Sequence, residues 1–119
     1  MDVFFCHTPG EPESPRNPKL SDITRNSLNL SWSEPLKDGG SHIIGYIIES
    51  RTPYNPRWSK VNRTPVKGTS YTLSDLLEGD ELEFRVVAVN EAGYSKPSTS
   101  TPMTKVKDPF GGSTIVVVL

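Results

Sequence analysis

The segment from Leu82 to Asn90 constrains the fold more than any other part of this chain. Alternate side chains along it are apolar and point to one face: Leu82, Phe84, Val86 and Ala88. The side chains between them, Glu83, Arg85 and Val87, point to the other face. A period of two, with β-branched residues and without Gly or Pro, predicts a half-buried β-strand. Because such a strand is not stable alone, its apolar face predicts a second sheet packed against it.

A second alternating segment precedes it in the chain. Leu28, Leu30 and Trp32 alternate with polar residues, and Pro35 then rules out continuation as a central strand. The sequence Asp-Gly-Gly-Ser at 38–41 is a strong turn signal, because glycine tolerates positive φ angles. We therefore predict an inward-facing strand that ends in a loop.

The segment 42–50 predicts the next strand. Tyr46 and Ile48 lie on one face of it, whereas Ile43 falls out of this phase, so we expect a bend near Gly45. Shorter strands follow near residues 58–61 and 71–73, and a last strand is expected over about 98–107. About seven short strands without helical periodicity predict an all-β fold, in which two antiparallel sheets pack face to face as an immunoglobulin-like β-sandwich.

Composition excludes several classes of function. A length of 119 residues predicts one domain, and a net charge of −1 does not favour nucleic-acid binding. No apolar run approaches the roughly 20 residues of a membrane span. Cys6 is the only cysteine, so no intramolecular disulfide can form. We expect a cytoplasmic protein.

The two ends differ from the rest of the chain. Residues 1–11 are interpreted as a leader or linker remnant, and residues 111–119 as a tail that is non-native or disordered. The apolar end of this tail leaves open a second interpretation, a C-terminal ligand for a PDZ domain. Pro12, Pro15 and Pro18 recur every third residue, which fits either a polyproline ligand for an SH3 domain or a lead-in whose prolines block stray strand pairing.

Several motifs occur together in this chain: Leu28-x-Leu30-x-Trp32, Asp38-Gly39-Gly40-Ser41, Gly45-Tyr46-x-Ile48-Glu49, Phe84-Arg85-Val86-x-Ala88-Val89-Asn90 and Lys107-Asp108-Pro109-Phe110. Together they resemble the fibronectin type III family, in particular its intracellular muscle (titin-like) branch. The resemblance implies a domain over residues 12–110, with sheets A-B-E and C-C′-F-G and with Trp32 at the centre of the core. It also implies termini at opposite poles, as in modules strung end to end. At the start of the F strand the family usually has a tyrosine that bonds back to the E–F turn, and this chain has Leu82 instead.

Residues suited to catalysis or cofactor binding are scarce. The only histidines are His7 and His42, and no Walker, GxSxG, GxGxxG or paired-cysteine motif occurs. Acidic residues crowd the expected E–F turn, where we interpret them as a solvated pole of the molecule: Asp75, Glu78, Asp80, Glu81 and Glu83. We expect no enzyme activity, no cofactor and no metal.

Charge and apolar residues suggest a protein-contact surface instead. A segment without Asp or Glu carries Arg51, Arg57, Lys60, Arg63 and Lys67, which could dock an acidic filament surface. Ile47 and Val87 are expected on the outward face of the C-C′-F-G sheet, where they would form a small exposed apolar patch. The candidate protein-contact residues are therefore Ile47, Arg51, Arg57, Lys60, Arg63, Arg85 and Val87.

The function expected from this resemblance is that of a non-catalytic structural and interaction module of a giant sarcomeric protein. It would act as a spacer, a mechanical element and a scaffold that binds neighbouring modules and the myosin thick filament, and the isolated domain would be a monomer. Two alternatives remain open at this point. The first is an extracellular adhesion or receptor module, for which Asn29 and Asn62 stand in N-glycosylation motifs. The second is a specificity domain of an enzyme.

Overall fold

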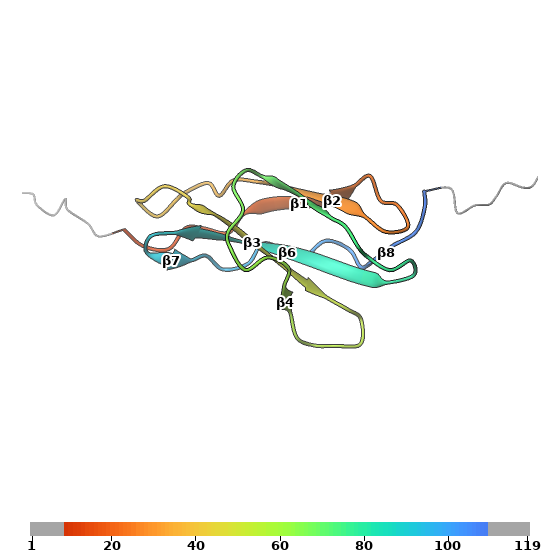
Figure 1. The fold of residues 1–119 in the computed structure, drawn as a ribbon. Helices are drawn as coiled ribbons and strands as arrows, with labels where there is room; N and C mark the ends of the chain where they lie inside the picture. Colours follow the sequence, from red (N-terminus) through yellow and green to blue (C-terminus); the bar gives the residue numbers. More distant parts are fainter. Residues whose placement is uncertain (1–8, 110–119) are drawn as a thin grey trace, which may run out of the picture.

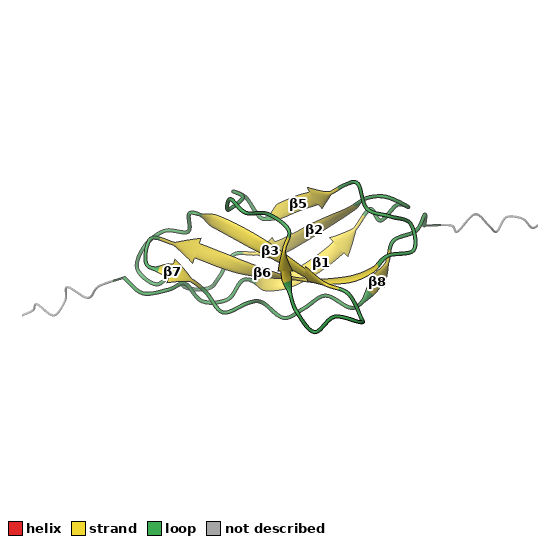
Figure 2. Cartoon of the chain, turned by 60° about the horizontal axis from the view of Figure 1, so that its bottom comes forward, coloured by secondary structure: helices red, strands yellow, loops and turns green. Residues whose placement is uncertain are grey.

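A computed structural model describes residues 9–109, which contain eight β-strands and no helix (Figures 1 and 2). In chain order the strands are β1 (Arg16–Ser21), β2 (Leu28–Ser33), β3 (Gly45–Arg51), β4 (Ser59–Lys60), β5 (Ser70–Leu73), β6 (Glu81–Asn90), β7 (Gly93–Tyr94) and β8 (Thr104–Lys105). None of the described residues forms a helix that could span a lipid bilayer.

The strands form two antiparallel sheets. One has the order β1-β2-β5, and the other has the order β4-β3-β6-β7, with β8 pairing with β6. These sheets correspond to the expected A-B-E and C-C′-F-G sheets, so the predicted β-sandwich is confirmed. Figure 2 shows the two layers lying face to face.

The core lies between the sheets and contains the side chains that alternation placed there. Trp32 is 5% exposed, and its ring meets that of Tyr46 edge to face, with centroids 5.2 Å apart. Phe84, Val86 and Ala88 of β6 are fully buried on the same side. The indole N–H of Trp32 has no hydrogen-bond partner within residues 9–109. Burial of these apolar side chains is the main force that holds the two sheets together.

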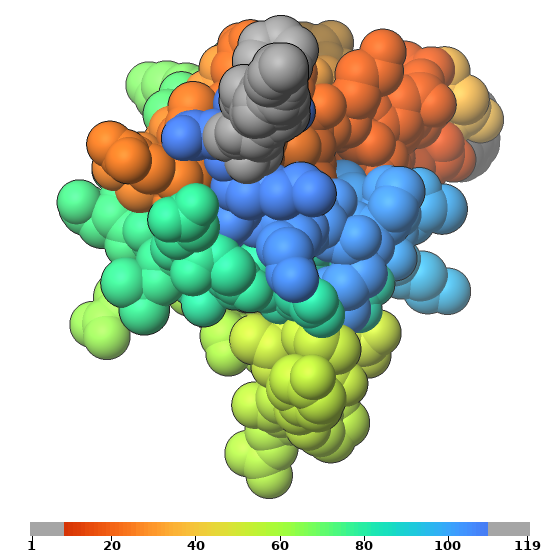
Figure 3. Space-filling model, turned by 90° about the vertical axis from the view of Figure 1, so that its right-hand side faces the viewer, coloured from red at the N-terminus to blue at the C-terminus, as the bar shows by residue number. Residues whose placement is uncertain are grey.

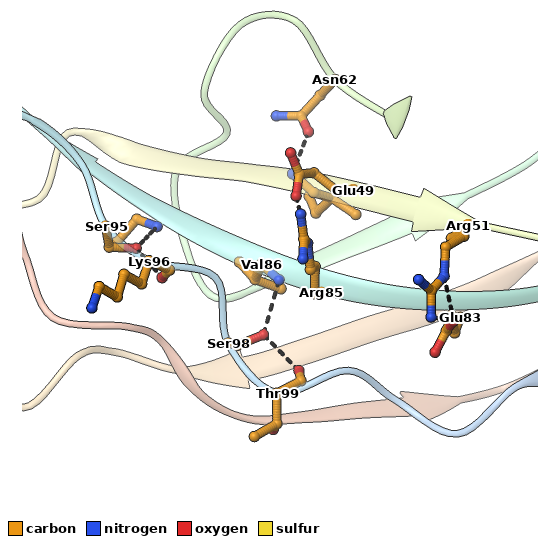
Figure 4. A network of polar contacts seen from close by, with 12 residues as sticks. Glu49, Arg51, Asn62, Glu83, Arg85, Val86, Ser95, Lys96, Ser98 and Thr99 are labelled. Atoms are coloured by element: carbon orange, nitrogen blue, oxygen red, sulfur yellow. Dashed lines mark hydrogen bonds and ion pairs between the residues drawn. The ribbon is translucent and has the colours of Figure 1, made fainter. Parts of the chain in front are cut away.

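The last strand differs from the prediction. Only β8 within 98–107 is a strand, and a further short strand that was not predicted, β7, precedes this segment. The segment between β7 and β8 still follows β6, through a ladder of side-chain hydroxyls, of which Figure 4 shows the bond between Val86 and Ser98. Phe84 N donates to Thr101 Oγ1, Val86 N to Ser98 Oγ and Ala88 N to Ser95 Oγ, at 2.9–3.0 Å. Prolines at 97 and 102 explain the split, because proline lacks the N–H that a regular strand needs.

The start of β3 also departs from the expected bounds of 42–50, since the strand spans Gly45–Arg51. The backbone passes close to a neighbouring segment at this point. A Cβ atom on Gly45 would lie 2.8 Å from Pro65 Cβ and 2.9 Å from Val66 O. Only glycine allows the two segments to lie this close together. This glycine is the residue near which the sequence predicted a bend.

The two ends of the described chain lie at opposite poles of the sandwich (Figure 1). At the first pole, Gly10 N donates to Gly39 O, and Asn90 Nδ2 donates to Gly10 O and to Asp38 O. At the other pole, Arg25 N donates to Asp108 Oδ1. Pro12 and Pro15 are buried against the domain, which argues against the polyproline-ligand interpretation. Cys6, His7 and residues 110–119 lie outside the described residues, so the predicted domain limits stay a prediction.

Candidate functional site

The outward face of the β4-β3-β6-β7 sheet is built around Trp58, which lies just before β4. The guanidinium carbons of Arg51 and Arg85 lie 4.7 and 4.3 Å from the centre of the Trp58 ring. These distances are typical of cation–π stacking. Arg51 comes from β3 and Arg85 from β6, so the indole is held by two neighbouring strands.

Each of these arginines is also paired with a carboxylate (Figure 4). Arg51 donates to Glu83 Oε2 from Nε at 2.7 Å and from Nη2 at 2.6 Å, and Arg85 Nε donates to Glu49 Oε1 at 2.6 Å. Both pairs stand directly opposite each other in the β3–β6 register. Glu83 is buried, so it is not part of the solvated acidic pole in which the sequence placed it. Arg51 and Arg85 are therefore largely neutralised and hold Trp58 in place.

Ile47 and Val87 do not form the exposed apolar patch that we expected. Their exposed fractions are 3% and 8%. They line the floor of a groove whose sides include Lys60, Arg85 and Tyr94. Long polar side chains cover outward-facing Ile and Val here, because their aliphatic stems pack on apolar surface while their charged ends stay in water.

The remaining candidate residues are exposed cations. Arg57 lies between β3 and β4, Lys60 lies in β4, and Arg63 follows it. Lys60 Nζ stands 5.7 Å from the centre of the Tyr94 ring. Within residues 9–109 no carboxylate lies at ion-pair distance from any of the three. The structure thus gathers Ile47, Arg51, Lys60, Arg85 and Val87 on one face and leaves Arg57 and Arg63 on its flanking loops.

Sequence reasoning missed the aromatic members of this face and the acidic partners of the two arginines. Trp58 was assigned only to a short strand, and Tyr94 to no site. One signal was present: Glu49 and Arg51 share the outward phase of β3, as Glu83 and Arg85 do in β6. Alternating charges on two adjacent strands favour cross-strand pairing once the register is known.

No group of three or more His, Cys, Asp and Glu side chains in the described part of the chain could hold a metal ion. Burial raises the pKa of the Tyr46 phenol above its usual value, and the Glu34 carboxylate adds to this increase. The nearby Trp32 indole opposes the shift. This phenol lies in the core, away from the outward face.

Comparison with known proteins identifies the family. The sequence profile of the fibronectin type III domain matches residues 13–104. The chain belongs to the fibronectin type III family. Human cardiac-type myosin-binding protein C is 35% identical over 99 residues, which are 82% of this chain and 8% of that protein. Titin of Drosophila melanogaster is 37% identical over 89 residues, or 75% of this chain and a share of titin that rounds to 0%.

A solved structure agrees with these relatives. A crystal structure of titin domains matches this fibronectin type III domain with a TM-score of 0.75 and 41% identity, over 82% of this chain and 33% of that one. The predicted resemblance to the muscle branch of the family is therefore confirmed. Because this domain spans only 8% of the length of myosin-binding protein C, the roles of the whole relatives are carried over only as proposals.

Proposed function

We propose that this domain is a non-catalytic structural and interaction module of a larger cytoplasmic, sarcomeric protein. It would keep neighbouring modules at a fixed spacing, resist extension, and bind proteins of the thick filament, with myosin as the expected partner. The observation that carries this proposal is the closed sandwich with its ends at opposite poles (Figure 1), in a chain whose relatives are long muscle proteins.

The mechanical part of the proposal is supported by the pairing of β6. This strand lies in the middle of its sheet and pairs with β3 on one side and with β7, the hydroxyl ladder and β8 on the other. A central strand with both edges paired must break many hydrogen bonds together before it can leave the sheet. This pairing of β6 on both edges is consistent with a load-bearing role for the domain.

The partner is proposed from the relatives and from the charge of the outward face. Myosin-binding protein C is named for its binding to myosin. Because this domain is similar to that protein, we propose myosin as its partner as well. The exposed cations Arg57, Lys60 and Arg63 favour an acidic partner surface.

The extracellular alternative gains no support from its strongest motif. Asn62 is 9% exposed, and its side-chain oxygen accepts a hydrogen bond of 2.7 Å from Ile48 N. Its amide donates to Tyr46 O and Thr64 O, both at 2.9 Å. A glycan would replace one of the two hydrogens on this nitrogen and so remove at least one of these donor contacts, and it would have to leave a buried position. The folded domain is therefore a poor acceptor at Asn62.

Cosedimentation with purified myosin filaments tests the proposal. The chain is expected to pellet with the filaments in a saturable way, and less so as the salt concentration rises. A fibronectin type III domain from an extracellular adhesion protein serves as the control. Pelleting no greater than that of the control would contradict the proposed myosin partner.

A further inference from the structure

Residues 52–57, which we call the β3–β4 arm, project away from both sheets. Figure 3 shows the arm in yellow, standing out from the body of the molecule. All six residues are exposed, and Tyr54 is 92% exposed. Single exposed aromatic residues are common on protein surfaces, so the exposure of Tyr54 needs further support before it indicates a function.

The arm has features that hold it in one shape. Pro53 and Pro56 restrict the φ angle at two of its six positions. Arg57 N donates to the side-chain oxygen of Asn55 at 2.9 Å, and Asn55 N donates to Thr52 O at 3.4 Å. An asparagine that bonds the backbone two residues ahead forms an Asx turn, which fixes the chain locally.

The base of the arm is anchored to the sheet. Arg51 directly precedes the arm, Trp58 directly follows it, and the Arg51 guanidinium lies over the Trp58 ring. Glu83 holds Arg51, while Arg85 lies over the same ring from β6. A loop that is already ordered loses less conformational entropy when a partner binds it.

Charge and residue type indicate what the arm would contact. Residues 50–74 contain no Asp or Glu. Arg51 is neutralised by Glu83, whereas Arg57, Lys60 and Arg63 have no ion-pair partner among residues 9–109. Arg57 therefore adds positive charge to the arm beside the exposed Tyr54, and Lys60 and Arg63 continue this positive charge along the neighbouring edge of the sheet. Tyr and Arg are among the residue types that contribute most to binding energy at protein interfaces.

We propose that the β3–β4 arm docks this domain on an acidic protein surface, with Tyr54 and Arg57 as the main contact residues. This inference rests on the proposed function and assigns its thick-filament contact to one element. Ile47 and Val87, which are buried, are not available as contact residues for this partner.

Cosedimentation of the full 119-residue chain with purified myosin filaments tests the assignment. Arg57→Glu and Tyr54→Ala should each weaken binding about tenfold, because each removes an interface residue of a hot-spot type. Arg25→Glu makes the same charge change on an exposed residue in the β1–β2 loop of the other sheet, and Leu36→Ala shortens another exposed apolar side chain. Both control variants should bind within about twofold of the natural chain.

The outcomes separate the arm from the proposed function. Failure of the natural chain to bind filaments would overturn both. If the natural chain and all four variants bound the filaments equally and in a saturable way, the contact would lie elsewhere. That result would overturn the assignment to the β3–β4 arm but not the proposed function. Equal binding to phosphatidylserine vesicles, lost in the same two variants, would show attraction to any anionic surface and overturn a protein partner. Thermal melts within a few degrees of the natural chain would exclude unfolding as the cause of weaker binding.

Discussion

Trp32 packs in the core between the two sheets, where its ring meets that of Tyr46. Its replacement by alanine leaves a large cavity between the two sheets. We expect Trp32→Ala to lower the free energy of unfolding by about 3–5 kcal/mol, enough to unfold a marginally stable domain. Denaturant titration followed by circular dichroism measures this loss. An effect below about 1 kcal/mol would contradict the central packing role of the indole.

Leu82 takes the place of the tyrosine that the family usually has at the start of the F strand. It is half-buried, faces Thr104 of β8, and lines a shallow groove together with Leu76 and Asp80. A tyrosine there keeps the apolar contact and adds a hydroxyl that can bond to the E–F turn. We expect Leu82→Tyr to be neutral or to stabilise the domain by up to about 1 kcal/mol in a urea titration. A loss larger than this would show that the groove does not accommodate the ring.

Tyr46 makes stability depend on alkaline pH. Its pKa is raised in the folded protein, first by burial and then by Glu34, so the folded state holds the proton more tightly than the unfolded state. The stabilisation that this protonated phenol gives the folded state is fully present below the usual tyrosine pKa of about 10. It is lost as the pH rises through the pKa of Tyr46 in the folded state. We expect Tyr46→Phe to reduce the loss of stability above pH 10, as measured by melting temperature from pH 8 to 11. If the melting temperatures of the natural chain and of Tyr46→Phe fell equally with rising pH, the raised pKa of Tyr46 would be contradicted.

The segment between β7 and β8 shows how an element without regular strand structure can still complete a sheet. Ser98 accepts a hydrogen bond from Val86 N at 2.9 Å through its side chain and donates to Val86 O at 2.8 Å through its backbone. In Ser98→Ala the first bond is lost and a buried N–H is left unpaired. We expect this variant to lose about 1–2 kcal/mol of stability.

Ser100→Ala is the matched control for this element, because Ser100 is exposed and lies two residues further along the same segment. It should change stability by less than about 0.5 kcal/mol. Hydrogen exchange at Val86 provides a direct second measurement, since its amide should exchange faster only in Ser98→Ala. Equal melting curves and equal exchange rates for the two variants would show that the hydroxyl ladder does not stabilise β6.

At the scale of the whole molecule, one core shared by two sheets predicts a single unfolding event under force. The roughly 95 folded residues correspond to about 300 Å of extended chain at about 3.3 Å per residue, from which the folded length is subtracted. With the chain held between marker domains, force spectroscopy should record one extension step close to this length. Two regular smaller steps would contradict a single cooperative sandwich.

Local alternation along the chain is enough to predict the buried faces of β2 and β6. Period-two alternation is a local property, so the positions of Phe84 and Trp32 in the core followed directly from their neighbours. The family also followed, because its motifs are short and contiguous. The break in alternation between Ile43 and Tyr46 was predictable for the same reason, since a phase change is visible within a few residues.

The charge pairs on the outward face form between residues that are far apart in the sequence. Arg51 and Glu83 are 32 residues apart, and Arg85 and Glu49 are 36 apart, so no local pattern shows that they pair. Their neutralisation depends on the β3–β6 register, which is set by burial of the whole sheet. Other contacts between distant residues have the same character. They bury Ile47 and Val87, bond side-chain hydroxyls to β6 where a regular last strand was expected, and hold the base of the β3–β4 arm through Trp58.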